Sequence, residues 1–198
     1  MFWGKRFNQR KNDDSDDDDE DDGAVTIQGS HIYFHGEVNE KNMMDISIAI
    51  DQFNDDRKAY REIYLHIQSW GGYVHTALGT ASAIVDSEIP VTTIIEGVAA
   101  SAATIIAIAG NDRRIRKNGC MMIHEIYGTL TGKKSVIDDD YINLQNLEKR
   151  VLDFFKERTN LSVKKLEKMF KRELEYSAEE CVKLNLVDEI INRKRRRV

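Results

Sequence analysis

Short apolar stretches alternate with amphipathic stretches along most of the chain, which predicts strands and helices in turn. The short stretches are rich in β-branched and aromatic residues, and the longer ones repeat apolar residues every three or four positions. Strands are expected at 25–27, 31–35, 62–68, 91–96, 114–116, 120–124 and 187–191. Helices are expected at 43–53, capped by Asn42, at 74–84, 101–109 and 135–158, and after Ser162 and Ser177. Such alternation is typical of parallel βαβ units, so the predicted fold class is α/β.

The predicted helix at 135–158 is long and lies outside this alternation. Its apolar residues form a helical stripe, which predicts that one face packs against protein. The stripe consists of Ile137, Tyr141, Leu144, Leu147, Val151 and Phe155. Two interpretations stay open, namely an arm through which subunits associate and a helix that covers the chain's own sheet.

Composition and charge place one globular domain between two charged tails. The chain has 198 residues, of which 41% are hydrophobic, and a net charge of -5. Residues 13–22 contain nine acids and one serine, and residues 193–197 are all basic. We therefore expect a solvated tail at 1–22, a folded domain at 23–192 and a basic tail at 193–198. The basic tail alone is weak evidence for nucleic-acid binding, and no such partner is expected.

The chain has neither the long apolar run of a membrane span nor a cysteine framework. With Cys120 and Cys181 as the only cysteines, the sequence predicts a protein of a reducing compartment, the cytoplasm. Phosphate-binding and dinucleotide-binding glycine motifs are absent, as are the common metal-binding spacings. No cofactor and no metal are therefore expected.

The sequence GVAASA at 97–102 is the first candidate for chemistry. It follows a predicted strand and begins an apolar helix, so Ser101 lies at a strand-to-helix turn beside free backbone amides. Such amides favour a developing negative charge, as at a nucleophile elbow. Ser101 as a simple helix N-cap is the alternative. A second turn, Gly71-Gly72, either donates amides to the same oxyanion or is only a tight connection.

A serine nucleophile needs a base, and His124 is the best placed of the five histidines. It ends an apolar strand, and parallel sheets place ligand sites at that end of their strands. His66 and His75 fall within a strand and a helix, where packing roles suit them better. Cys120 is a minor candidate nucleophile, because its apolar neighbours indicate packing. Composition does not select the carboxylate that would orient the base.

Four segments in order resemble the proteolytic subunit of the Clp protease, a serine peptidase family. The segments are IYLHIQSWGG at 63–72, GVAASA at 97–102, MIH at 122–124, and YSAEE at 176–180 with LNLVD at 184–188. The resemblance implies a ClpP/crotonase-like fold whose long helix is the handle between stacked heptameric rings. It implies a self-compartmentalised endopeptidase fed by an AAA+ ATPase partner. It also implies Ser101 as nucleophile, His124 as base, and the amides of Gly72 and Ala102 as the oxyanion hole.

The chain also departs from the family pattern. Glu173 stands where the family has the triad aspartate, Trp70 replaces a proline, and the acidic run occupies the place of the axial loop. These features suit a divergent, phage-encoded relative acting in the host cytoplasm. Two other hypotheses remain open, a non-catalytic ring subunit and a crotonase-type acyl-CoA enzyme.

Overall fold

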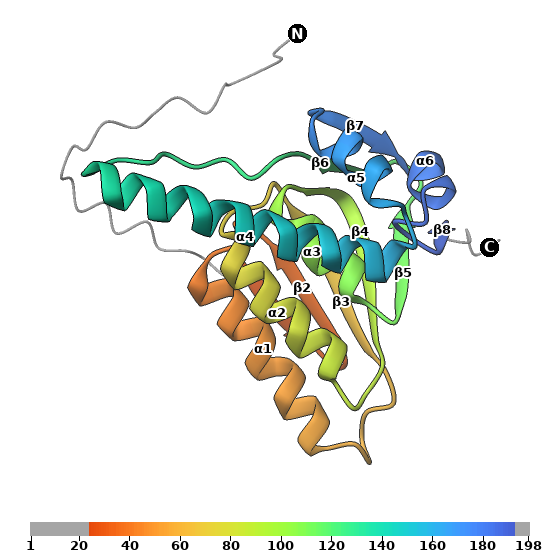
Figure 1. Ribbon diagram of the computed structural model, residues 1–198. Coiled ribbons are helices and arrows are strands. Elements are labelled where there is room, and N and C mark those ends of the chain that lie inside the picture. Colours follow the sequence, from red (N-terminus) through yellow and green to blue (C-terminus); the bar gives the residue numbers. More distant parts are fainter. Residues whose placement is uncertain (1–23, 193–198) are drawn as a thin grey trace, which may run out of the picture.

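The computed structural model describes residues 24–192, so the charged runs at 13–22 and 193–197 lie outside the described part of the chain (Figure 1). Its elements are β1 (Val25–Gln28), β2 (His31–His35), α1 (Glu40–Asp55), β3 (Ile63–Ser69), α2 (Val74–Asp86), β4 (Val91–Ala100), α3 (Ala102–Ala109), β5 (Asp112–Arg116), β6 (Cys120–Ile123), α4 (Lys134–Thr159), α5 (Val163–Phe170), β7 (Leu174–Ser177), α6 (Ala178–Lys183) and β8 (Glu189–Ile191).

The eight strands of residues 24–192 form one sheet in the order β1-β2-β3-β4-β5-β8. β6 pairs with the far end of β4, and β7 pairs with β6. Only the β1–β2 and β6–β7 pairs are antiparallel, so the expected α/β fold with parallel βαβ units is confirmed.

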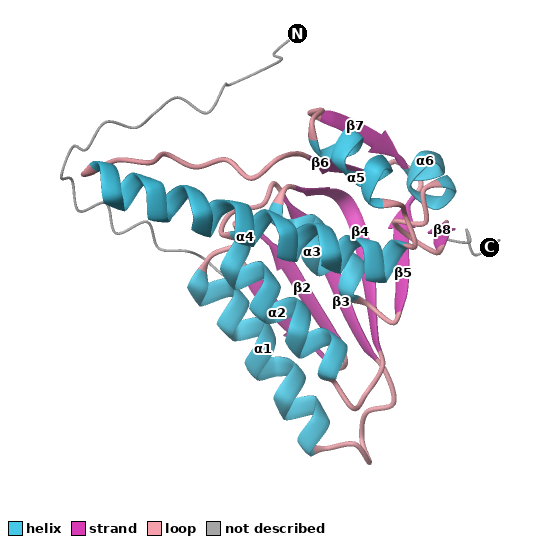
Figure 2. Cartoon of the chain, viewed as in Figure 1, coloured by secondary structure: helices cyan, strands magenta, loops and turns pink. Residues whose placement is uncertain are grey.

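The helices lie mainly over one face of this sheet (Figure 2). Ile63, Leu65 and Ile67 of β3 are fully buried in a core shared with α1, α2 and α3. The residues between them, Tyr64 and His66, point to the other face, as the two-residue period of a strand requires. α3 is buried along its whole length, which agrees with its sequence of alanines, isoleucines and one threonine.

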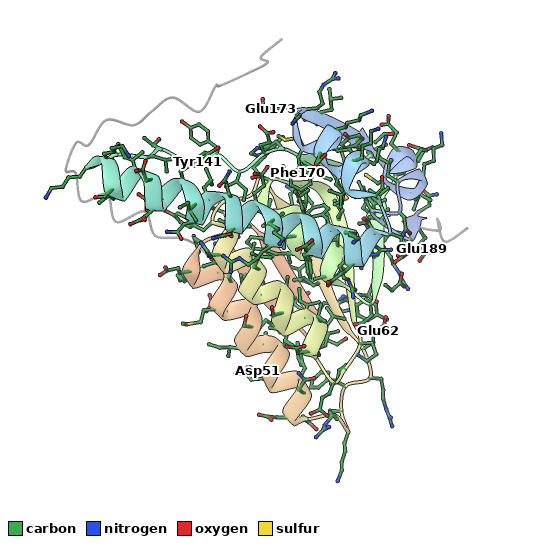
Figure 3. All side chains as sticks on the ribbon, in the orientation of Figure 1. Asp51, Glu62, Tyr141, Phe170, Glu173 and Glu189 are labelled. Carbon is green, nitrogen blue, oxygen red and sulfur yellow. The ribbon has the colours of Figure 1, made fainter. Side chains whose placement is uncertain are left out.

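The helix α4 has one packed half and one projecting half. Leu147, Val151 and Phe155, in its second half, are buried in the core. Its first half extends beyond the sheet, and Tyr141 and Ile142 are 54% and 53% exposed there. Tyr141 points away from α1 and α2 (Figure 3). The predicted apolar stripe therefore continues past the part of α4 that packs against the rest of the chain.

Two expectations about local structure need correction. Helix α1 begins at Glu40, and its N-cap is Asn39, whose side chain accepts a hydrogen bond from the backbone N–H of Asn42. Asn42 is buried inside the helix and donates to the carbonyl of Glu37, so it is not the cap. The strand β7 was not predicted. Ser162 and Ser177 do cap α5 and α6, and Ser177 forms the expected capping box with Glu180.

Across residues 24–192, no helix is both long and apolar enough to cross a membrane.

Candidate active site

Ser101 lies at a strained turn between β4 and α3. Its φ of 53° and ψ of -128° belong to a region that residues other than glycine rarely adopt, at a cost of about 1–3 kcal/mol. Ser101 occupies the N-cap position of α3, but its side chain makes no capping hydrogen bond. The backbone is held instead, because the Ser101 N–H donates to the carbonyl of Met122 at 2.8 Å. The half-buried hydroxyl is therefore not used for capping.

The glycine turn after β3 packs directly against Ser101. A Cβ on Gly71 would lie 2.6 Å from the Cβ of Ser101, and both Gly71 and Gly72 have positive φ. Val38 pairs with this turn, because its N–H donates to Gly71 and its carbonyl accepts from Tyr73. In a parallel bridge of this kind, Gly71 and Tyr73 bond to Val38, and the N–H of Gly72 between them points away from Val38. That side of the glycine turn is the side on which β4 lies.

The helix α3 contributes amides to the same place. Ala102 is its first residue and is buried, and the first four N–H groups of a helix have no carbonyl partner within that helix. The turn orients α3 firmly, since Thr104 bonds back to the Ser101 carbonyl through both its N–H and its hydroxyl. The glycine turn and the first residue of α3 thus both adjoin Ser101, and the amides of Gly72 and Ala102 belong to these two elements.

His124 directly follows β6, which pairs in parallel with the end of β4. Ala100 is opposite Met122, so Ser101 and His124 come from neighbouring strand ends at the same edge of the sheet. The half-buried ring of His124 does not bond to Ser101 in the structure. Its Nδ1 lies 2.6 Å from the backbone carbonyl of Glu125, to which it donates in the Nδ1–H tautomer.

Glu173 is exposed and lies immediately before β7. The antiparallel ladder between β6 and β7 ends at the pair Ile123 and Leu174, so the next register position sets His124 opposite Glu173. Residues opposite each other in such a ladder project from the same face. The ladder stops before this pair, and the His124 ring contacts the backbone carbonyl of Glu125 rather than Glu173.

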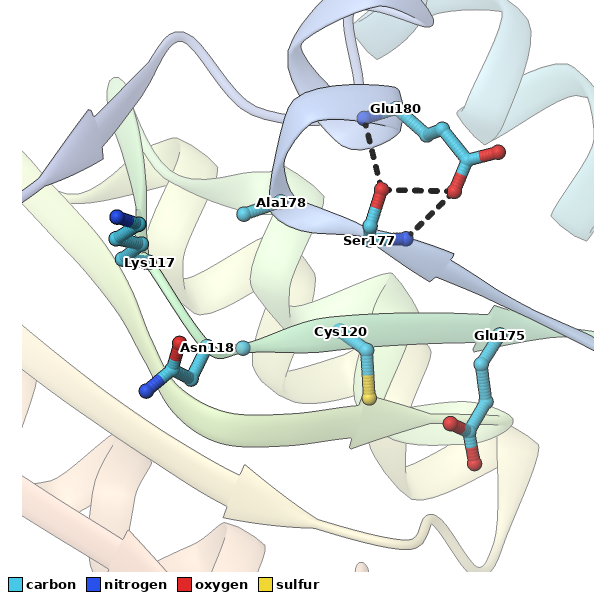
Figure 4. A pocket seen from close by; sticks show the side chains of 8 residues that line it. Lys117, Asn118, Cys120, Glu175, Ser177, Ala178 and Glu180 are labelled. Atoms are coloured by element: carbon cyan, nitrogen blue, oxygen red, sulfur yellow. Dashed lines mark hydrogen bonds between the residues drawn. The ribbon is translucent and has the colours of Figure 1, made fainter.

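Cys120 and Glu175 lie together nearby, beside the capping box of Ser177 and Glu180 (Figure 4). Burial raises the pKa of the Cys120 thiol, and the neighbouring carboxylate of Glu175 raises it further. Because the thiolate is the reactive form, these surroundings disfavour Cys120 as a nucleophile.

A second polar cluster was not predicted. His66 donates to Glu96 at 2.7 Å, and Arg116 donates to the same carboxylate at 2.8 Å and 3.0 Å. Burial lowers the pKa of His66, although its hydrogen bond to Glu96 acts in the opposite direction. The alternation of Tyr64, His66 and Gln68 with buried residues of β3 was the available signal for this cluster.

The arrangement combines an unused hydroxyl at a strained turn, two sets of backbone amides beside it, and an imidazole at the neighbouring strand end. These are the parts that acyl transfer through a serine requires. Among residues 24–192, no three or more His, Cys, Asp or Glu side chains are grouped so that they would hold a metal ion.

Comparison with known proteins places this chain in a protease family. The sequence model of the family described as Clp protease matches residues 18–194. The chain belongs to the Clp protease family. It is 26% identical over 163 residues to the "ATP-dependent Clp protease proteolytic subunit 1" of Salinibacter ruber, and the alignment covers 81% of this chain and 70% of that protein. The resemblance drawn from four sequence segments is therefore confirmed.

Proposed function

We propose that the chain is a serine endopeptidase, the proteolytic subunit of a self-compartmentalised Clp-like barrel. The observation that carries this proposal is the backbone of Ser101. A positive φ at a non-glycine residue persists only where the surroundings impose it. Here the strained turn presents a hydroxyl that serves no capping role, between the glycine turn and the first amides of α3.

In the proposed reaction, the Ser101 hydroxyl oxygen attacks the carbonyl carbon of a peptide bond while His124 accepts the hydroxyl proton. The resulting oxyanion accepts hydrogen bonds from the N–H groups of Gly72 and Ala102. His124 then donates the proton to the leaving amine, and water releases the acyl group in the second half of the reaction. Glu173 accepts the remaining N–H of His124 and so fixes the tautomer of the imidazole.

This mechanism requires the His124 ring to exchange one partner for another. Its Nδ1 now donates to the Glu125 carbonyl, and an extension of the β6–β7 ladder by one pair would set Glu173 opposite His124. A rotation of the His124 and Glu173 side chains, with the strands unchanged, would replace the carbonyl by the carboxylate. Catalytic hydrogen bonds often tighten only when substrate binds.

The proposal extends to assembly and partners. The exposed apolar residues on the first half of α4 support contact with a second ring, as the handle of stacked heptameric rings. An AAA+ ATPase would feed unfolded polypeptides into such a barrel, and the name of the Salinibacter ruber relative describes an ATP-dependent protease.

A non-catalytic ring subunit is the second candidate function, and one observation favours it. The His124 Nδ1 is satisfied by the Glu125 carbonyl, and Glu173 is exposed, so the structure shows no hydrogen-bonded triad among the described residues. Such a subunit would pair with an active paralogue and would keep the assembly surfaces without the chemistry.

Labelling with a fluorophosphonate distinguishes the two functions, because this reagent forms a covalent bond with an activated serine. The wild-type chain should be labelled at Ser101, as located by peptide mass spectrometry, and Ser101→Ala should not be labelled. The wild type should also cleave small fluorogenic peptides without ATP. Absence of both labelling and cleavage in the assembled wild type would favour the non-catalytic subunit.

A further inference from the structure

Glu96 is held from both sides on the face of the sheet away from α1, α2 and α3. One carboxylate oxygen accepts from His66 Nδ1 at 2.7 Å and from Arg116 Nη2 at 3.0 Å, and the other accepts from Arg116 Nε at 2.8 Å. His66 also contacts His31, with 2.9 Å between His66 Nε2 and His31 Nδ1, and the ring of Tyr33 stacks on it at 4.3 Å. The carboxylate therefore links β3 with β5 across β4.

This link lies where β4 changes its neighbour. β4 pairs with β5 as far as Ile95 and Ile115, so Glu96 and Arg116 occupy the next register position. From Val98 onward, β4 pairs with Cys120 and the rest of β6 instead. Glu96 directly follows the last β4–β5 pair, and only Gly97 separates it from Val98, where the pairing with β6 begins.

The pairing between β4 and β3 shifts at the same point. Ile67 is opposite Ile95, but Ser69, two residues later, is opposite Ala99, four residues later. β4 therefore carries two extra residues, which form a bulge between the straight part of the strand and its end. A bulge bends its strand and interrupts the ladder, so the ladder alone does not fix the direction of the residues beyond the bulge. Ser101 comes two residues after Ala99.

The charge state of the cluster suits a firm link. Burial alone would raise the pKa of Glu96, but the hydrogen bonds from Arg116 and His66 outweigh it and lower the pKa. Glu96 is thus an anion that accepts two charge-assisted bonds from a guanidinium, which is a geometrically specific interaction.

We propose that Glu96 is a positioning residue, which through His66 and Arg116 fixes the bulge in β4 and thereby the placement of the Ser101 turn. The inference rests on the proposed peptidase function of Ser101. Glu96 does not touch substrate in this proposal. It acts on the direction of the last residues of β4, and small displacements of a nucleophile have large effects on rate.

The decisive variant is Glu96→Gln, which keeps the shape but sets an amide N–H₂ group against a donor of Arg116 or His66. Peptide cleavage should show kcat per active site lowered by about 10- to 10²-fold, because the nucleophile turn is displaced. KM should stay within about twofold, since binding groups remain in place. Active sites are counted by complete fluorophosphonate titration, so that unfolded chains do not enter the kcat.

A matched control lies on the same face of the sheet. Asp112 accepts two hydrogen bonds from Arg114. Both residues lie in β5, beside the part of β4 that precedes the bulge. Asp112→Asn makes the same loss of charge at the same kind of pair, and kcat per active site should not change. Arg116→Lys is a second test variant, which keeps the charge on the partner of Glu96 but removes the two-point contact. It should lower kcat in the same direction by less.

The outcomes separate this inference from the function on which it rests. A lower kcat per site in Glu96→Gln and Arg116→Lys, with Asp112→Asn unchanged, supports the positioning role. If the wild type is labelled and all three variants have the same kcat per site as the wild type, the positioning role is overturned and the peptidase function stays intact. Wild type without labelling or cleavage would overturn the peptidase function and the positioning role with it. If Glu96→Gln does not fold, Arg116→Lys decides by the same criterion.

Discussion

Gly71 faces Ser101 with no room for a side chain between them, since a Cβ on Gly71 would lie 2.6 Å from the Cβ of Ser101 and 2.8 Å from the carbonyl oxygen of Ala100. Both of those neighbours belong to the strained turn. The φ of Gly71 is 105°, which L-residues rarely adopt. The glycine turn and the serine turn are therefore packed directly against each other, with no space for a side chain at position 71.

Gly71→Ala should abolish most activity because the added methyl group must displace the Ser101 turn. We expect kcat for peptide cleavage to fall by at least about 10²-fold, the effect of roughly an ångström of misplacement at a reacting group. Gly79→Ala is the matched control, since a Cβ there meets nothing within 4 Å on α2. It should stabilise the fold by about 0.5–1 kcal/mol and keep full activity. Equal activity of both variants would contradict the described fit.

The exposed apolar side chains on the first half of α4 lead us to expect self-association. Tyr141 and Ile142 are each more than half exposed on a helix that extends beyond the sheet. We expect the wild type to form particles of many chains in multi-angle light scattering. Tyr141→Asp combined with Ile142→Asp should reduce the particle mass, because carboxylates do not bury readily without partners.

A control for this prediction uses the same helix. Asn143→Asp adds a carboxylate at an exposed polar position on a different face of α4, and the particle mass should not change. A wild type that is strictly monomeric at micromolar concentration, or a double variant as large as the wild type, would argue against α4 as the contact between rings.

Much of this fold is predictable from sequence periodicity, and the exceptions have local causes. Strands of the β3 kind are predictable because their short sequences are rich in β-branched and aromatic residues. The cap of α1 was misplaced by three residues, since Asn39 and Asn42 are both suitable and only the buried contact of Asn42 with Glu37 distinguishes them. β7 was missed because the strand has only four residues and is largely exposed, so no pattern of buried residues marks it.

The site was predictable as far as strand order determines it. The ends of parallel strands meet at one edge, which is why Gly72, Ser101 and His124 follow neighbouring strand ends. The contact of the His124 ring with a backbone carbonyl depends on side-chain torsions that no spacing encodes. The Glu96 cluster depends on which strands are neighbours and on their register, which periodicity does not reveal.

His66 makes stability sensitive to acid. Burial lowers its pKa in the folded protein from the ordinary value of 6.5. The unfolded chain therefore binds the proton at a higher pH than the folded chain, and stability is retained above about pH 6.5 and falls as the pH decreases below it. Urea unfolding should give a lower midpoint at pH 5.5 than at pH 7.5. The pH dependence should be weaker in His66→Gln.

His75→Gln is the control for this titration, because His75 is an exposed histidine on α2. It should keep the pH dependence of the wild type. His31 Nδ1 lies 2.9 Å from His66 Nε2, so His31→Gln changes the surroundings of His66 and should also change the pH dependence. A pH dependence that is the same in all four proteins would assign the effect to other groups.

Two substitutions test whether Glu173 belongs to the proposed triad. If Glu173 orients His124, Glu173→Gln should lower kcat by about 10²- to 10⁴-fold, since the imidazole loses the acceptor that fixes its tautomer. Glu173→Asp withdraws the carboxylate by one methylene group. If the backbone is adapted to glutamate, kcat of Glu173→Asp should be lower than that of the wild type. If glutamate fits poorly, kcat should be higher. A change of kcat in either direction keeps Glu173 in the triad.

Glu175 provides the matched control, because it lies two residues further along β7, on the same face, and is directed to Cys120. Glu175→Gln removes the same charge at the same strand, and it should change kcat by less than about twofold and stability by about 0.5 kcal/mol or less. Steady-state peptide cleavage, with active sites titrated, measures all three variants alongside Ser101→Ala. Equal rates for the wild type and both Glu173 variants, with Ser101→Ala inactive, would exclude Glu173. His124 would then rely on the Glu125 carbonyl that it already contacts at 2.6 Å, or on another carboxylate.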